Sequence, residues 1–134
     1  MDKQLQDVAE YLIKNLKEEG FTIHRYNAYS TNSIYLKLDY GVANSIRISD
    51  HIGKSYLKYR YNFILGGIPY KHEMDEFPRF YFNETTIEQL LDTIKREKIH
   101  KIACYGSGSY NKYMRQNKAN IPKQKGFWKQ AKLV

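Results

Sequence analysis

Hydrophobic and polar residues alternate from residue 33 to residue 63, which predicts three consecutive β-strands separated at Gly41 and Gly53. Side chains of a strand point to opposite faces in turn, so the apolar positions share one face and the polar positions share the other. The apolar set is Ile34, Leu36, Leu38, Tyr40, Ile46, Ile48, Leu57, Tyr59, Tyr61 and Phe63. The pattern therefore predicts a meander with one buried face and one solvated face.

The solvated face of this meander is basic and rich in tyrosine. The residues expected on it are Tyr35, Lys37, Arg47, Ser49, His51, Tyr56, Lys58 and Arg60. Two arginines on adjacent strands, as Arg47 and Arg60 would be, can grip a phosphate through paired hydrogen bonds. The structural alternative is a cross-strand pairing of Arg47 with Asp39 or Asp50.

Segments on either side of the meander predict helices and further strands. Near the N-terminus, apolar residues recur at the spacing of one helical face, and Gly20 follows where a C-terminal cap belongs. That face comprises Leu5, Val8, Ala9, Leu12, Ile13 and Leu16. Residues 21–26 and 79–82 are typical of strands.

A second helix is predicted to open at the T-x-x-E capping pattern of Thr85 and Glu88. Its apolar face is Ile87, Leu90, Leu91 and Ile94. This face loses its phase after Glu97, which indicates that the helix ends or bends there. A further short helix is expected from about Ser109.

These elements predict an α+β fold, in which an antiparallel meander sheet of four to five strands carries the N-terminal helix and the C-terminal helices on one face. A chain of 134 residues has room for about one core. Residues 1–118 are therefore expected to form a single domain, and residues 119–134 a basic C-terminal extension.

Positive charge is concentrated at the C-terminal end of the chain. Residues 98–134 contain nine Lys or Arg and no Asp or Glu. The net charge of the whole chain is +8, so all of the excess positive charge lies in this segment. A field of one sign favours an anionic partner such as nucleic acid or a phosphorylated ligand, with a merely solvated basic face as the alternative. Phe127 and Trp128 are large apolar groups that a purely electrostatic extension would not need.

Several classes of site find little support in the sequence. The single cysteine, Cys104, excludes internal disulfides, and no metal site or cofactor is expected. No apolar run approaches the roughly 18 to 20 residues of a membrane span, so we expect no membrane partner and a cytoplasmic location. His100 and Cys104 are four residues apart but have no evident activating third group, and no catalytic residue is assigned.

The turn from Gly106 to Ser109 is a second candidate anion site. Exposed N–H groups at a helix start, together with flexible glycines, can wrap a phosphate, which makes Ser107 and Ser109 candidate ligand-binding residues. The turn matches neither a Walker loop nor a dinucleotide fingerprint, and an ordinary helix-entry loop is the alternative.

The pattern TNSIYLKLDYGVANSIRISDH, followed by YLKYRYN, resembles small accessory proteins of phages and prophages in low-GC Gram-positive bacteria. The likeness covers about residues 5–65 and includes no catalytic motif. Such proteins are often counter-defence factors. The resemblance implies a non-enzymatic protein that acts in the cytoplasm of the infected bacterium and evades immunity by sequestering a nucleotide signal.

Two other functions stay open at this point. In the first alternative, the protein binds nucleic acid or a nucleoprotein and inhibits a host nuclease complex, as an anti-CRISPR protein does. The C-terminal lysines would then lie along the nucleic-acid backbone, and tyrosines would stack on bases. A nucleotide-processing enzyme, the second alternative, would require the histidines to converge.

We predict that the protein self-associates into a dimer or a higher symmetric oligomer. A tyrosine-lined sheet face and an acidic segment after Phe63 offer more contact surface than a small monomer usually leaves exposed. Light scattering should give a multiple of the 16.0 kDa chain mass. A mass of one chain across a wide concentration range would contradict the prediction.

Overall fold

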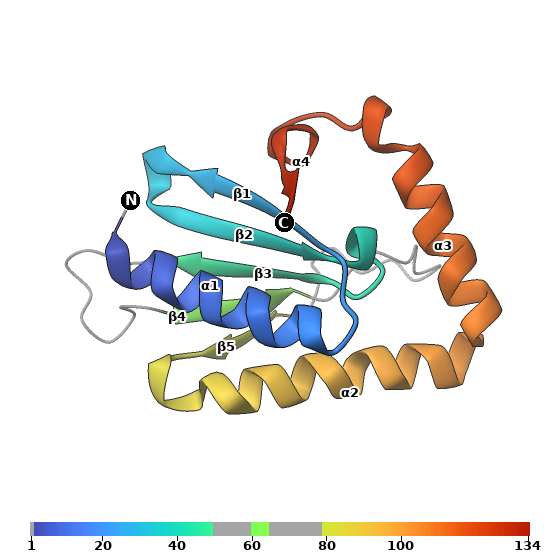
Figure 1. Cartoon of the computed structure of the whole chain (residues 1–134), viewed down its shortest axis with the longest axis horizontal. Coiled ribbons are helices and arrows are strands. Elements are labelled where there is room, and N and C mark those ends of the chain that lie inside the picture. The colour runs from blue at the N-terminus through green and yellow to red at the C-terminus, as the bar shows by residue number, and fades with distance from the viewer. Residues whose placement is uncertain (1, 50–59, 65–78) are drawn as a thin grey trace.

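The computed structural model describes residues 2–49, 60–64 and 79–134, and within them six strands form one antiparallel sheet in the order β5-β4-β3-β2-β1-β6. The strands are β1 (Ile23–Ala28), β2 (Ser33–Leu38), β3 (Ser45–Ser49), β4 (Arg60–Ile64), β5 (Arg79–Phe82) and β6 (Lys132–Leu133). The helices are α1 (Lys3–Glu18), α2 (Ile87–Tyr105), α3 (Ser107–Ala119) and α4 (Phe127–Gln130). The predicted α+β class is confirmed (Figure 1).

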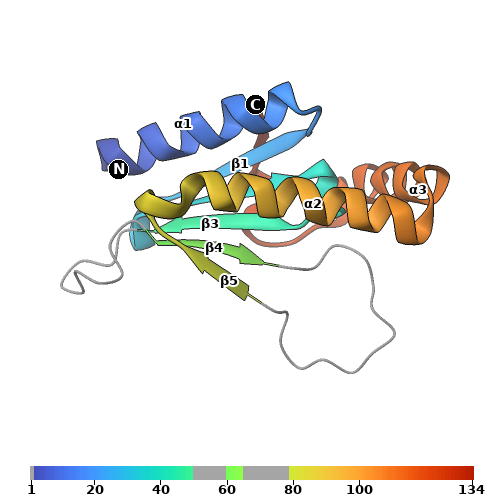
Figure 2. The same cartoon turned by 90° about the horizontal axis from the view of Figure 1, so that it is seen from below.

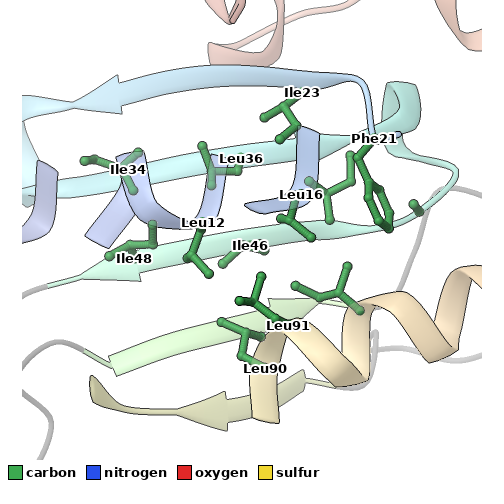
Figure 3. Packing of buried hydrophobic residues seen from close by; sticks show 14 of the residues in the cluster. Leu12, Leu16, Phe21, Ile23, Ile34, Leu36, Ile46, Ile48, Leu90 and Leu91 are labelled. Carbon is green, nitrogen blue, oxygen red and sulfur yellow. The ribbon is translucent and has the colours of Figure 1, made fainter. Parts of the chain in front are cut away.

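Helix α1 forms as predicted and buries one stripe of apolar residues. The side chain of Asp2 caps its first turn by accepting hydrogen bonds from the backbone N–H groups of Gln4 and Leu5, at 2.7 and 3.4 Å. The buried residues Leu5, Ala9, Leu12 and Leu16 follow the spacing of one helical face. Figure 3 shows Leu12 and Leu16 in one cluster with strand residues and with Leu90 and Leu91 of α2.

The register of the sheet confirms the predicted alternation. Ile34 pairs with Ile48 and Leu36 with Ile46, and all four are fully buried beneath α1 and α2 (Figures 2 and 3). On the opposite face Tyr35 pairs with Arg47. Strand β4 begins at Arg60, and the part of the third predicted strand before it lies outside the described residues.

The loss of phase predicts that this helix ends or bends after Glu97, but α2 does not end there and continues to Tyr105. The inward positions that follow Ile94 at helical spacing are Lys98 and Lys101, which hydropathy alone marks as solvent-facing. Lys101 is only 2% exposed, and its Nζ donates to the carbonyl oxygen of Val42 at 2.7 Å and to Oδ1 of Asn44 at 2.8 Å. Burial lowers the pKa of Lys101 to about 8. Lys98 and Lys101 therefore occupy the inward face of α2 after Ile94, where polar contacts replace apolar packing.

Asp39 joins the sheet to the C-terminal helices. Its carboxylate is fully buried. It accepts hydrogen bonds from the backbone N–H of Thr22 at 2.8 Å and from the hydroxyl of Tyr110 at 2.5 Å. It also forms an ion pair with Nζ of Lys98 at 2.8 Å. Burial and the bond to Asp39 raise the pKa of Tyr110. Asp39 therefore pairs with Lys98 of α2 rather than with Arg47.

The turn η2 (Asp39–Gly41) that follows β2 is strained. Asp39, Tyr40 and Gly41 all have positive φ values, of 49°, 57° and 91°. Left-handed backbone costs about 1 to 3 kcal/mol at each non-glycine residue and persists only where surrounding contacts fix it. The bonds of Asp39 to Thr22, Lys98 and Tyr110 provide that fixation.

After α3 the chain passes to the opposite face of the sheet (Figure 1). We call residues 120–134 the C-terminal arm; it comprises η5 (Ile121–Lys123), α4 and β6. The ring centroid of Trp128 lies 6.1 Å from that of Tyr35, edge to face, and the two-residue β6 pairs with β1. The expectation that the C-terminal helices share one face holds for α2, whereas α4 contacts the other face.

We predict that Asp39→Ala lowers the free energy of unfolding by about 3 to 5 kcal/mol, because it leaves Lys98 and the hydroxyl of Tyr110 without their buried partner. Urea unfolding measures the loss. The matched control is Asp92→Ala, which breaks an exposed ion pair between two residues of α2, Asp92 and Arg96. It should lower the free energy of unfolding by less than about 1 kcal/mol. Equal losses in the two variants would show that the Asp39 cluster does not hold the fold.

Candidate ligand-binding site

Three predicted site residues come together on the face of the sheet opposite α1 and α2. Tyr35 and Lys37 belong to β2, Arg47 belongs to β3, and all three are partly buried. The guanidinium carbon of Arg47 lies 5.8 Å from the ring centroid of Tyr35. Trp128 covers this face next to Tyr35 and Lys37, so the C-terminal arm encloses part of the predicted surface.

The other predicted residues on this face have different surroundings. Ser49 is buried and its hydroxyl shares a 2.9 Å hydrogen bond with that of Ser33, which is a contact within the sheet. The backbone of Arg60 pairs with Ser49, and His51 and Lys58 lie outside the described residues.

Ser107 and Ser109 lie in the first turn of α3, at the corner where α2 and α3 meet (Figure 1). Both are exposed, and Gly106, with a φ of 85°, permits the sharp change of direction between the helices. Neither serine lines the cavity described next. The structure thus separates this turn from the residues around Lys37.

A cavity of about 130 Å³, which we call the arm pocket, lies between the sheet and the C-terminal arm. Its walls come from β1, β2, η2, α3 and the arm. They consist of His24, Lys37, Tyr40, Asn117, Ile121, Gln124, Trp128, Ala131 and Leu133. Aromatic, aliphatic and hydrogen-bonding groups therefore line one small space, as is usual for small-molecule sites.

Two polar atoms of the arm pocket are buried and have no hydrogen-bond partner in the described part of the chain: Nδ1 of His24 and Oε1 of Gln124. A buried polar atom without a partner costs about 1 to 3 kcal/mol. A fold retains such a cost where a ligand or water supplies the missing bond. Both residues line the same cavity, which marks it as the candidate binding site.

Tyr40 does not lie on the buried face of the sheet, where the alternation of the sequence predicts it; the strained turn η2 places it in the wall of this cavity. The ring centroid of Tyr40 lies 5.1 Å from that of His24, and its carbonyl oxygen accepts a 2.9 Å hydrogen bond from Nδ2 of Asn117. Asn117 belongs to α3, so this bond ties the helix to the turn. The position of the wall thus depends on the left-handed backbone at residues 39 and 40.

Lys37 supplies the cationic group of the arm pocket. Its Nζ lies 5.1 Å from the ring centroid of Trp128, within the range of a cation–π contact. Burial lowers the pKa of Lys37, and burial together with the charge of Lys37 lowers the pKa of His24. An anion beside Lys37 would favour its charged form.

Sequence reasoning found only part of this site. Lys37 was predicted, and the apolar character of Trp128 indicated that the arm packs against something. His24 follows from the strand at 21–26, because the register pairs it with Lys37 on the same face. No sequence signal identifies Gln124 or Asn117.

In the described part of the chain, other reactive groups form no comparable site. Cys104 Sγ lies 3.6 Å from Nε2 of His100 on one face of α2, but both residues are exposed. Within residues 2–49, 60–64 and 79–134, no group of three His, Cys, Asp or Glu is placed to hold a metal ion. Among the helices that the structure describes, none is long and apolar enough to cross a membrane.

The fold and the arm pocket define an α+β protein with a ligand-sized cavity under its C-terminal arm. Comparison of the chain with protein-family models, with curated proteins and with solved structures found no match. The assignment of function therefore depends on the chemistry of the site.

We predict that His24 titrates below its ordinary pKa of 6.5 and that Lys37→Met raises this pKa part of the way back. The increase is partial because burial is the larger cause and remains in the variant. The pH dependence of the imidazole resonances measures both values by NMR. The control is Lys3→Met, which removes an exposed charge on α1 and should leave the pKa of His24 unchanged. An equal change of this pKa in both variants would contradict the placement of Lys37 beside His24.

Proposed function

We propose that the protein binds a small phosphate-bearing ligand of the nucleotide class in the arm pocket and sequesters it without chemical conversion. The observation that carries the proposal is that His24 and Gln124, which each carry a buried polar atom without a partner in the described part of the chain, line one cavity together with Trp128 and Lys37. A ring with hydrogen-bonding edges and an attached anion matches these groups.

The charge distribution supports an anionic ligand. Residues 98–134, which include α3 and the arm, contribute nine basic and no acidic residues. Lys37 adds a cation from the sheet. A positive electrostatic field around a cavity raises the local concentration of anions and speeds their association.

Sequestration also agrees with the resemblance to phage accessory proteins. A counter-defence protein that removes a nucleotide immune signal in the cytoplasm of an infected bacterium needs tight binding and no catalytic group. His100 and Cys104 lie on α2, and neither lines the arm pocket. The chemistry of the pocket therefore favours a binder over a nucleotide-processing enzyme.

The second candidate is a nucleic-acid or nucleoprotein binder that inhibits a host nuclease complex. Four lysines of the arm, Lys123, Lys125, Lys129 and Lys132, are exposed, as is Tyr81 on β5. Lysines can neutralise the backbone of a single strand while aromatic rings stack on its bases, and a long strand would have to cross the sheet to reach both the arm and Tyr81 on the opposite edge. The two candidates differ in the number of phosphates that they bind.

Trp128 is the single tryptophan, so its fluorescence reports on the arm pocket directly. We predict that mononucleotides and cyclic dinucleotides change its emission in a saturable manner. Lys37→Met should weaken this binding by roughly 10- to 150-fold, the usual effect of losing a hydrogen bond to a charged group. Lys3→Met is the control and should bind like the wild type.

Salt dependence separates the two candidates. A small nucleotide should give a shallow slope of log K against log salt, whereas a single strand contributes roughly 0.7 per phosphate contact. Binding of single strands alone, with a steep slope that Lys37→Met leaves intact, would overturn the proposal in favour of the second candidate. A response to none of these compounds would exclude both.

A further inference from the structure

A second hollow of about 310 Å³ shares one lining residue, Tyr40, with the arm pocket. It is lined by Tyr40, Asn111, Met114, Arg115 and Lys118, so Tyr40 is a wall of both spaces. All the residues of the second hollow except Tyr40 come from α3. A ligand that fills the arm pocket can therefore extend past Tyr40 onto α3.

The size and chemistry of the arm pocket suit a single six-membered ring. Its volume of about 130 Å³ is close to that of a cavity of roughly 150 Å³ that admits benzene. Unlike such an apolar cavity, it is lined by His24 and Gln124, which each carry a buried polar atom without a hydrogen-bond partner in the described part of the chain, Nδ1 and Oε1. A flat heteroaromatic ring with a donor and an acceptor on its edge satisfies both atoms, and Trp128 and Tyr40 provide aromatic walls.

The second hollow suits an anion. Arg115 and Lys118 are three residues apart on α3, which places them on the same side of the helix, and both are exposed. In the part of the chain that the structure describes, neither forms an ion pair with an acidic residue. Arginine binds phosphate oxygens through its planar fork, and lysine adds a point charge.

We infer that the ligand is a pyrimidine nucleotide, with its base in the arm pocket, where Lys37 donates a hydrogen bond to an oxygen of the ring, and its phosphate on Arg115 and Lys118. The inference rests on the proposed function and adds the ring class and the direction of the ligand. The sugar spans Tyr40, the residue that the two spaces share. A purine fits less well, because its second ring needs more volume than the arm pocket provides.

Isothermal titration with uridine, uridine monophosphate, adenosine monophosphate and inorganic phosphate tests the inference. Uridine monophosphate should bind at least tenfold more tightly than either uridine or adenosine monophosphate. Arg115→Gln and Lys118→Gln should each weaken uridine monophosphate by about tenfold or more and leave uridine unchanged. Lys112→Gln, an exposed lysine of α3 that lines neither space, is the control and should change nothing.

Gln124→Leu separates the two ends of the ligand, because it should weaken uridine and uridine monophosphate by the same factor. A thermal melt checks that this variant still folds. Binding of purine nucleotides at least as tight as that of pyrimidines, or affinity unaffected by Arg115→Gln and Lys118→Gln, overturns the inference and leaves the proposed function standing. Absence of binding by any nucleotide, with water satisfying His24 and Gln124, overturns both.

Discussion

The carboxylate of Asp39 is the constraint on which the rest of the structure depends. It is a buried charge at the end of a central strand, and isolated it would cost several kcal/mol. Its three partners come from different parts of the chain: the backbone before β1, Lys98 of α2 and Tyr110 of α3. Satisfying one charge therefore fixes the directions of two helices relative to the sheet.

The same interaction determines where the binding site lies. With α3 anchored through Tyr110, the chain that leaves this helix reaches the face of the sheet that α1 and α2 leave open (Figures 1 and 2). Trp128 then packs on Tyr35, and the turn after Asp39 directs Tyr40 toward His24. The arm pocket is the space between a sheet and an arm that a single buried ion cluster positions.

The elements that were predicted correctly are those whose signal is local. Helix α1 follows from the period of its apolar residues and its cap at Asp2, and β2 and β3 follow from strict alternation. The length of α2 could not be predicted in this way, because Lys98 and Lys101 occupy inward positions that only long-range partners make tolerable. Those partners, Asp39 and the carbonyl of Val42, are more than fifty residues away along the chain.

The candidate site divides in the same manner. Alternation correctly places Tyr35, Lys37 and Arg47 on one face, because side-chain direction in a strand depends only on position. The residues that turn this face into a cavity, Tyr40 and Gln124, depend on a strained turn and on the path of the arm, neither of which leaves a period in the sequence. Of the residues that line the pocket, the sequence pattern therefore predicted Lys37 but not Tyr40 or Gln124.

The residues that line the arm pocket come from distant parts of the sequence, from His24 to Leu133. These residues come together in the folded chain, so the proposed ligand would bind the native state in preference to the unfolded one. Binding is then coupled to folding, and a ligand at one hundred times its dissociation constant stabilises the native state by about 2.7 kcal/mol. The concentration of the proposed ligand would therefore change the stability of the protein as well as its occupancy.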